Sequence, residues 1–450
     1  MDSKVVPFTS LGDENDKNDE SYKHKLSEHS PDKAQAGEYK NVYKEQEVDR
    51  TSTASHDKPP VVSQKVFLQM PRMRYDHHHP IHSVTVLDIP NLDDTFVVAC
   101  DENSVGVWSL RFGQFLLDLP AEHSAKISMV TTYVDDECTS SIITGSWDES
   151  IHIWPLDVVC VTSGDGSNVQ HTITAKKCTI LNGHTNRILT LKTTPNKHGK
   201  CHVDGPLLVS GSADSTIRVW SLTTSTFLYE LSHCSIVTWV LCVDVYYSEE
   251  MNCAVVISGG KDNTLRLWKL CSPVEKEIIR PFRVINDCPS RIVAMAITAV
   301  TVTRDPPNST ISVSDESSAN RIHMNKATDK KASEGLMGTN TEHEGPMIAV
   351  ICKNYLHIRV FSILTGQLIR LLSGHNHAIN DIVTCFSPRF QSHILVSVSA
   401  AGNLRGWNPM SGELLKTFRG HTGGVLAACL FSPLLAPEDV IIVSGEWVSG

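Results

Sequence analysis

The feature that most constrains this chain is a hairpin pattern that recurs along its length. Each copy has an aliphatic run, a short polar turn and alternating residues that end in an aromatic side chain. Alternation with a period of two, together with Gly and Asp in the turn, predicts a β-hairpin. The clearest copies are residues 142–156, 207–222 and 255–270. Weaker copies are residues 96–110, 347–363 and 393–409.

The spacing of the copies predicts a ring of similar sheets. Trp108 and Trp154 are 46 residues apart, as are Phe361 and Trp407. That is about the length of one four-stranded blade of a β-propeller with its loops. Trp220 and Trp268 are 48 residues apart, whereas the two wider gaps, Trp154 to Trp220 and Trp268 to Phe361, require insertions.

A histidine precedes most of the hairpins and completes a recognisable motif. These histidines are His123, His184, His233, His375 and His421. With the Ser-Gly-x-x-Asp-x-Thr-(Ile/Leu)-Arg-(Val/Leu)-Trp segment that follows, the repeats resemble the WD-repeat family over roughly residues 64–450. The Asp after Trp that gives the family its name is missing in every copy. The resemblance implies an all-β fold, a seven-bladed WD-repeat β-propeller whose last blade is incomplete.

The chain is predicted to have two parts. Residues 1–60 are polar, with few aliphatic side chains, and we expect a disordered tail. Residues 61–450 form the propeller, in which Lys65–Met70 is expected to close the last blade as its outer strand. Because the last blade stops early, we expect a C-terminally truncated sequence, with a strand from a partner as the alternative. The blades are expected at about 79–120, 121–181, 182–231, 232–283, 284–372, 373–418 and 419–450.

Three long connections interrupt the pattern. Residues 304–345 are rich in Ser, Asn, Lys and acidic residues, so we expect one disordered insertion, with a hidden eighth blade as the alternative. We interpret residues 158–176 and 194–205 as loops. All three connections are expected on the face of the ring opposite to the one that binds partners.

The family resemblance implies a hydrogen-bonded relay inside a blade, formed by a His, a hydroxyl, a turn Asp and a Trp. Pairing these groups avoids a penalty of about 1–3 kcal/mol for each buried polar atom left without a partner. A His–Ser–Asp set also invites a hydrolase interpretation, but its recurrence in three blades favours a structural role. The matching residues are His123, Thr144, Asp148 and Trp154 in blade 2, His184, Ser210, Asp214 and Trp220 in blade 3, and His233, Ser258, Asp262 and Trp268 in blade 4.

The resemblance also implies a binding surface on the top face, which carries the turn between the second and third strands of each blade. Six cationic and aromatic residues fall at the family's contact positions: Lys126, Trp147, Arg187, Trp239, Lys261 and Arg291. Exposed Trp and Arg often dominate interface energy, and Arg pairs well with carboxylate and phosphate. The surface therefore predicts a partner segment with acidic or phosphorylated residues. The alternative is that the cations are merely solvated and the Trp residues merely pack.

Composition narrows the remaining choices. A net charge of −10 argues against a general nucleic-acid binder. No apolar run is long enough to span a membrane, and no secretory signal opens the chain. Without a secretory route, the 13 cysteines are expected to be reduced, in the cytosol or nucleus. We expect no cofactor and no metal site, including at His77–His79 and at the loop with His198, Cys201 and His202.

These observations favour a non-enzymatic scaffold for protein–protein interactions. The second hypothesis is a substrate receptor of a cullin-type ubiquitin ligase, because Trp108-Ser109-Leu110-Arg111 is similar to the segment that docks such repeats on the ligase adaptor. The third is a propeller enzyme, which the repetition of the same polar residues argues against, because catalysis needs a unique constellation.

Overall fold

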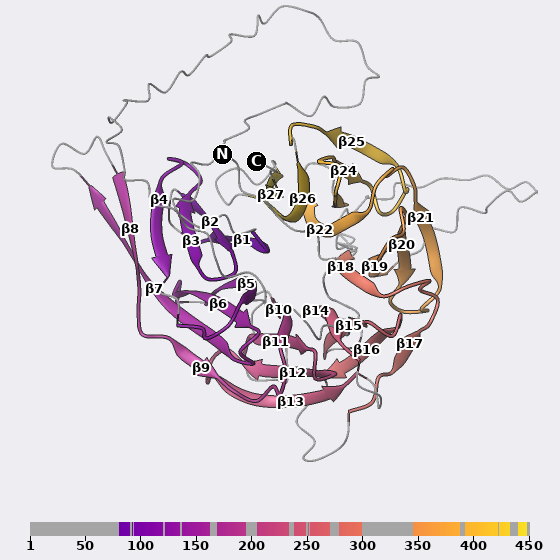
Figure 1. The fold of residues 1–450 in the computed structure, drawn as a ribbon, viewed down its shortest axis with the longest axis horizontal. Helices are drawn as coiled ribbons and strands as arrows, with labels where there is room; N and C mark the ends of the chain where they lie inside the picture. Colours follow the sequence, from indigo (N-terminus) through magenta and orange to yellow (C-terminus); the bar gives the residue numbers. More distant parts are fainter. Residues whose placement is uncertain are drawn as a thin grey trace, which may run out of the picture. The chain divides into compact units, whose positions relative to one another are not determined.

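The computed structural model describes strands arranged radially about a common axis (Figure 1). None of the described residues is helical. The description covers residues 81–298 and 345–447, apart from residues 91, 93, 120–121, 136, 163–168, 195–204, 234–237, 249–250, 252, 271–278, 388–391, 422 and 433–439. The predicted tail, the segment Lys65–Met70, both discounted histidine clusters and nearly all of residues 304–345 lie outside this description.

Each blade is an antiparallel sheet whose strands follow one another from the axis outwards. Blade 1 contains β1 (Ser83–Asp88), β2 (Thr95–Cys100), β3 (Val105–Ser109) and β4 (Phe115–Leu119). Blade 2 contains β5 (Ile127–Val134), β6 (Ser140–Ser146), β7 (Ile151–Thr162), β8 (Val169–Ala175) and β9 (Thr179–Leu181). Blade 3 contains β10 (Ile188–Thr193), β11 (Leu207–Ser212), β12 (Thr216–Ser221) and β13 (Thr226–Ser232).

The second half of the ring repeats this plan. Blade 4 contains β14 (Val240–Ser248), β15 (Cys253–Gly260), β16 (Leu265–Leu270) and β17 (Arg283–Ile285). Blade 5 contains β18 (Ile292–Thr298), β19 (Met347–Cys352), β20 (Ile358–Ser362) and β21 (Leu368–Leu372). Blade 6 contains β22 (Ile379–Ser387), β23 (Ser392–Ser399), β24 (Leu404–Trp407) and β25 (Leu414–Phe418).

The prediction of seven blades is corrected to six. The last two strands, β26 (Gly424–Phe431) and β27 (Ile441–Trp447), pair only with each other in the described part of the chain and form a two-stranded sheet. This hairpin lies between blade 6 and blade 1, beside β1 (Figure 1). The motif at Gly420-His421 thus marks a further hairpin, but two strands do not make a blade.

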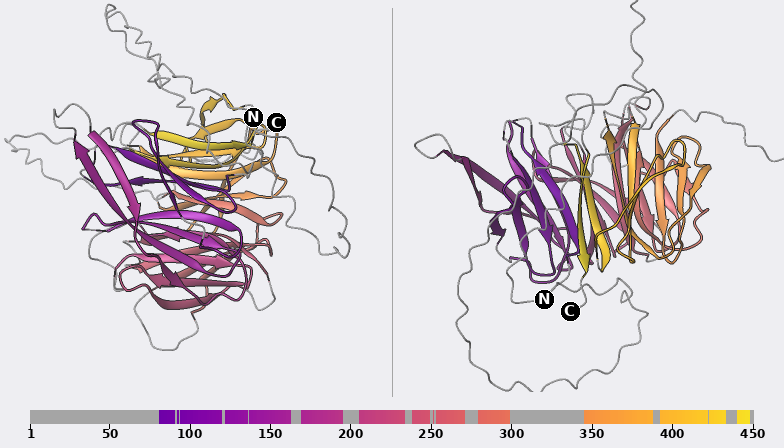
Figure 2. Two further views of the ribbon diagram at one scale, coloured as in Figure 1. Left: turned by 60° about the vertical axis from the view of Figure 1, so that its left-hand side comes forward. Right: turned by 90° about the horizontal axis from the view of Figure 1, so that it is seen from above.

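Blade 2 departs from the plan, and the prediction of a loop at residues 158–176 was wrong. Strand β7 continues to Thr162 and β8 pairs with that extension, while the short β9 pairs with the first part of β7. Figures 1 and 2 show this ribbon reaching beyond the neighbouring sheets. It is anchored by His171, which is buried and packs edge-on against Phe96 of blade 1, with ring centroids 5.9 Å apart.

The core lies between neighbouring blades, and in blades 3 to 5 the second strand is the most buried part. Every residue of β11 and β15 is buried, which explains their unbroken apolar and small-residue sequences. Burying this apolar surface contributes about 25 cal/mol per Å². The blades are therefore held together by packing across their faces, with little strand pairing between them.

Side chains of the innermost strands also connect adjacent blades by hydrogen bonds. Asp244 of blade 4 accepts a bond from the backbone N–H of Ile297 in blade 5 at 3.0 Å. Asp381 of blade 6 accepts one from Ala428 of β26 at 3.1 Å. Burial raises the pKa of Asp381 to about 6, although the bonds from the backbone N–H groups of Ala428 and Ile382 lower it. The two carboxyls thus fix the spacing of the inner strands.

Candidate functional site

The structure brings the predicted relay residues of blades 2 and 3 together. In blade 3, the His184 Nδ1 lies 2.8 Å from an Asp214 oxygen and the Nε2 lies 2.8 Å from the Ser210 hydroxyl. The Trp220 indole N–H donates to the same hydroxyl at 2.9 Å. Blade 2 has the same arrangement, with His123 2.9 Å from Asp148 and 2.8 Å from Thr144, and Trp154 donating to Thr144 at 3.4 Å.

Blade 4 makes the relay with the imidazole turned over. Here Nδ1 of His233 meets the Ser258 hydroxyl at 2.8 Å and Nε2 meets Asp262 at 3.3 Å. Trp268 donates to Ser258 at 3.0 Å. His233 lies seven residues before its inner strand, against four for His184. Either orientation of the imidazole satisfies both of its nitrogens.

The remaining blades keep only part of the relay. In blade 6, His375 contacts Ser397 at 2.7 Å and Trp407 donates to Ser397 at 2.8 Å, but Ala401 stands where blades 2 to 4 have Asp. In blade 5, Cys288 takes the place of the histidine, and its thiol forms a hydrogen bond with Cys352. These blades depend more on apolar packing.

The relay hydroxyls are poorly placed to act as nucleophiles. Ser210 and Ser258 have no exposed surface and Thr144 is 1% exposed. A nucleophile must reach a substrate carbonyl as well as its base. Within the described residues the relay therefore stabilises the blades, and this geometry offers no entry for a substrate.

Burial and hydrogen bonding set the charge of the relay residues. Burial alone would raise the pKa of Asp148, but hydrogen bonds from Ser150 and His123 outweigh it and lower the pKa to about 2. Burial lowers the pKa of His375 to about 4, and the charge of Arg405 adds to the effect. Burial also lowers the pKa of His123, against the effect of Asp148, so the folded protein favours neutral histidine beside ionised aspartate in blade 2.

This arrangement predicts a loss of stability in mild acid. A histidine whose folded pKa is below 6.5 binds protons more weakly in the folded chain, so the free energy of unfolding falls as the pH drops from about 6.5 towards 4. We expect His375→Gln to reduce this loss, measured as melting temperature against pH. The exposed His377→Gln is the control and should behave like the unchanged protein. Equal acid sensitivity in all three proteins would contradict the prediction.

The six predicted surface positions lie in backbone-linked pairs at one end of the blades. In each pair, a residue just before the second-to-third-strand turn donates its N–H to the carbonyl of the residue that precedes the inner strand. Trp147 donates to Lys126, and Lys261 donates to Trp239, both at 2.9 Å. Arg187 and Arg291 accept equivalent bonds from Ala213 and Lys353. Both sets of positions therefore lie on the top face.

Cations stack on both tryptophans of this face. The Arg187 guanidinium carbon lies 4.2 Å from the ring centroid of Trp147, and the Lys126 ammonium lies 5.3 Å from it. In blade 4, the Lys261 ammonium lies 4.7 Å from the Trp239 ring centroid. Such contacts contribute about 0.5–1 kcal/mol at exposed sites and hold the side chains in place. Arg187 and Lys261 are exposed, whereas Trp147 and Trp239 are half-buried.

Sequence reasoning missed Glu102 and His82 as members of this surface. Glu102 forms a 2.6 Å ion pair with Lys126 and lies 3.5 Å from His82. Burial opposes ionisation of Glu102, but the bond to Lys126 and its charge outweigh that and lower the pKa. Glu102 precedes the turn of blade 1 as Trp147 precedes that of blade 2, so the repeat register was the signal that pointed to it. Arg291 has no stacked ring among the described contacts and lies beside Lys353.

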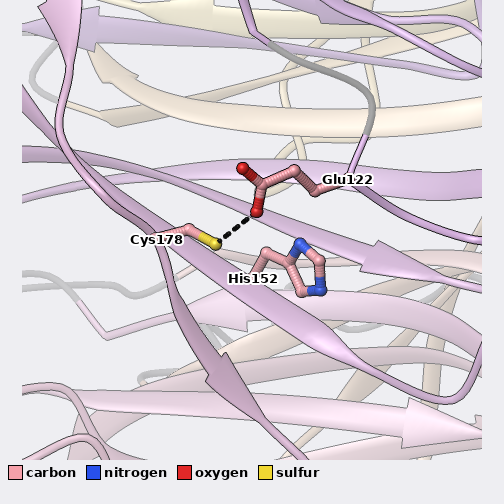
Figure 3. A group of neighbouring side chains, drawn as sticks. All are labelled: Glu122, His152 and Cys178. Atoms are coloured by element: carbon pink, nitrogen blue, oxygen red, sulfur yellow. Dashed lines mark hydrogen bonds between the residues drawn. The ribbon is translucent and has the colours of Figure 1, made fainter.

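A group of potential metal ligands in blade 2 was also missed. Atoms of Glu122, His152 and Cys178 that are able to bind a metal all lie within 4.8 Å of one another (Figure 3). The Cys178 thiol donates to a Glu122 oxygen at 3.1 Å. The three residues are far apart in sequence and match no ligand spacing, so only the pairing of β9 with β7 brings them together.

The segment Trp108–Arg111, which was proposed to dock on a ligase adaptor, has one buried end and one exposed end. Trp108 is 4% exposed and lies inside blade 1. Arg111 is exposed, and its backbone N–H donates to Asp94 at 3.0 Å.

Comparison with known proteins agrees with the repeat pattern. The family model described as WD domain, G-beta repeat matches residues 175–221 and 225–269, which include the relays of blades 3 and 4. Mitochondrial division protein 1 of Aspergillus niger is 27% identical over 164 residues, which are 32% of this chain and 22% of that protein.

Two further relatives match shorter stretches. An uncharacterized WD repeat-containing protein of Schizosaccharomyces pombe is 34% identical over 90 residues, 18% of this chain and 16% of that protein. Nuclear distribution protein PAC1 of Candida tropicalis is 36% identical over 77 residues, 17% of this chain and 15% of that protein. The chain spans less than a quarter of the length of the curated relatives it matches.

The described part of the chain contains no helix able to cross a membrane. Its sheets are antiparallel and are arranged radially about one axis, with about one sequence repeat for each sheet. Propellers built from these repeats generally act as scaffolds for other proteins. The comparisons therefore show WD repeats at residues 175–221 and 225–269, and the structure places them in a β-propeller.

Proposed function

We propose that this protein is a non-enzymatic scaffold that binds a segment of another protein across its top face. The segment carries acidic or phosphorylated residues next to apolar ones. The observation that carries the proposal is the stack of Lys126, Trp147 and Arg187, which spans the boundary between blades 2 and 3.

The stack suits a ligand of mixed character. The Trp147 ring offers apolar surface, and the contacts with Lys126 and Arg187 hold it in place. The exposed Arg187 guanidinium retains donors in a forked arrangement that matches carboxylate or phosphate. Lys261 on Trp239 repeats the combination in blade 4. A peptide that crosses blades 2 to 4 would meet aromatic and cationic groups in alternation.

Charge reversal on this surface tests the proposal. We expect Arg187→Glu combined with Lys261→Glu to weaken binding of an acidic or phosphorylated peptide by at least about a hundredfold, because each of the two lost charged contacts costs about 1.5–3 kcal/mol. Binding is measured by titration with a library of such peptides. The matched control is Lys269→Glu, since Lys269 also stacks on a ring of blade 4, at 4.8 Å from Phe282.

Two results would decide the matter. Loss of binding in the double variant, with the Lys269→Glu protein unchanged, supports a ligand on the top face. Equal peptide affinity in the double variant and the unchanged protein contradicts it. Melting curves of all three proteins check that the replacements leave the fold intact.

We also propose that the protein is located in the cytosol or nucleus. Nine cysteines in the described part of the chain are free thiols, and five of them are buried. Free thiols persist in a reducing compartment. A fluorescently tagged chain found in the secretory pathway would contradict this placement.

A further inference from the structure

Blade 2 differs from the other blades at three positions that meet in space. His152 on β7 stands where four other blades have arginine: Arg218, Arg266, Arg359 and Arg405. Glu122, directly before the relay histidine, stands where blades 3 and 6 have Gly183 and Gly374. Cys178, two residues before the partner of His152 in β9, stands where other blades have apolar residues: Leu116, Leu228, Phe282, Ile369 and Leu415.

The three changes depend on one another because the side chains share one volume inside the blade. In blade 3, the guanidinium of Arg218 fills the place beside Gly183, where a Cβ atom would lie only 2.1 Å from Nη1. Blade 6 shows the same relation between Gly374 and Arg405, at 2.2 Å. In blade 2 the shorter His152 vacates that place and the Glu122 side chain enters it. A cation and an apolar side chain are thus replaced by a nitrogen, a carboxylate and a thiol.

One of these donors is buried without a partner. The His152 side chain is 3% exposed and its Nδ1 has no hydrogen-bond partner among the described residues. The other nitrogen, Nε2, lies 3.2 Å from the Ser150 hydroxyl. The ring is held in place by stacking on the relay His123, with centroids 3.7 Å apart and planes 18° from parallel. Figure 3 shows the imidazole facing the Glu122 carboxylate and the Cys178 sulfur.

We propose that Glu122, His152 and Cys178 bind a zinc ion. An imidazole nitrogen, a thiolate and a carboxylate are the donors zinc takes in proteins, and three protein ligands leave a fourth position for water. Nitrogen and sulfur donors exclude the hard cations Mg²⁺ and Ca²⁺, which prefer oxygen. The site is independent of the top-face surface.

The spacing of the donors suits this ion. Ligand atoms around a tetrahedral zinc lie roughly 3.4–3.8 Å apart, given bonds of about 2.0–2.3 Å. The Cys178 sulfur and the Glu122 oxygen are already 3.1 Å apart, and no pair in the group exceeds 4.8 Å. Side-chain movements of about 1 Å therefore complete the shell. The exposed Glu122 leaves a path to solvent.

Zinc binding removes one proton from Cys178 and breaks the hydrogen bond between Cys178 and Glu122. The Cys178 thiol gives its proton to solvent, and the thiolate takes the zinc in place of the bond to Glu122. The neutral His152 uses the lone pair on Nδ1, while Nε2 carries the hydrogen towards Ser150. Each ion bound thus releases one proton. The ion also joins the segment before β9 to β7, next to the relay of blade 2.

Zinc titration of the full chain tests the site. The protein is stripped with a chelator, titrated with Zn²⁺ and analysed for bound metal, with Co²⁺ as a spectroscopic probe of thiolate ligation. We expect Cys178→Ser and Glu122→Gln each to weaken zinc binding at this site at least about tenfold, since even residues behind the ligands alter affinity by that factor. Cys178→Ser should also abolish the thiolate-to-cobalt band. Cys138→Ser, in the same blade, is the matched control and should keep both properties.

A consensus variant separates binding from folding. Glu122→Gly, His152→Arg and Cys178→Leu together rebuild the trio that blade 3 already contains, so this variant is expected to fold. It should hold one zinc fewer than the unchanged protein, and added Zn²⁺ should raise the melting temperature of the unchanged protein more. Equal zinc content, equal thermal response and the same cobalt spectrum in the unchanged, Cys178→Ser and consensus proteins would overturn the proposal.

Discussion

Asp214→Ala is expected to lower the free energy of unfolding by about 3–5 kcal/mol, because it leaves several buried or half-buried donors without their acceptor, each at a cost of about 1–3 kcal/mol. One Asp214 oxygen accepts bonds from the His184 ring at 2.8 Å and from the Thr185 N–H at 3.0 Å. The other accepts bonds from the Thr216 N–H at 2.8 Å and its hydroxyl at 2.7 Å. Alanine leaves all four donors without this acceptor, and His184 has no exposed side-chain surface with which to recruit water.

The control for this prediction is an aspartate with a short ion pair outside the relay. Asp157 lies 2.6 Å from Lys176, but both side chains are about half exposed. Asp157→Ala should therefore cost about 0–1 kcal/mol. Denaturant unfolding gives both values. If the two variants lost equal stability, the relay would have no special part in holding the blade.

Trp268→Ala is expected to cost about 3–5 kcal/mol by leaving a cavity between blades 3 and 4. The side chain has no exposed surface and belongs to a core cluster that includes Leu207 and Val219 of blade 3. Its loss also removes the N–H donor that reaches Ser258 at 3.0 Å. The cost therefore combines lost apolar burial with a weakened relay.

A phenylalanine at this position separates the two contributions. Trp268→Phe keeps most of the apolar contact and removes the indole N–H, so we expect a cost of about 1–3 kcal/mol. Blade 5 already has Phe361 at the equivalent position, fully buried and without a relay. Unfolding curves of both variants give the comparison. A Phe variant as unstable as the Ala variant would show that the N–H bond outweighs packing.

The relay and the top face were predictable because the repeat fixes their register. A hairpin with alternating residues determines which side chains face the core, and the His, hydroxyl and Asp recur at fixed offsets from the closing aromatic. Lys126, Trp147, Arg187 and Lys261 follow from the same offsets, and the structure pairs them by backbone bonds. The stacking of Arg187 from blade 3 on Trp147 of blade 2 joins two repeats, so no single repeat contains the information.

Other features escaped prediction for physical reasons. The β7–β8 ribbon has β-branched residues in both strands, but its sequence was interpreted as a loop because it lies outside the blade pattern. The predicted blade count included an incomplete last blade closed by Lys65–Met70, a segment outside the described residues. The Glu122–His152–Cys178 group arises from three departures from the repeat, each unremarkable alone. Only strand pairing shows that they coincide.

The central claim is that polar groups inside the blades give stability while the top-face cations and aromatics give binding. The most direct test measures both properties in one set of proteins: the Arg187→Glu and Lys261→Glu double variant beside Asp214→Ala. The account predicts that the first loses peptide affinity and keeps its unfolding free energy. It predicts that the second loses stability and, at a temperature where it is folded, keeps its affinity. If both variants lost affinity and stability together, the two roles would not be separate and the account would be wrong.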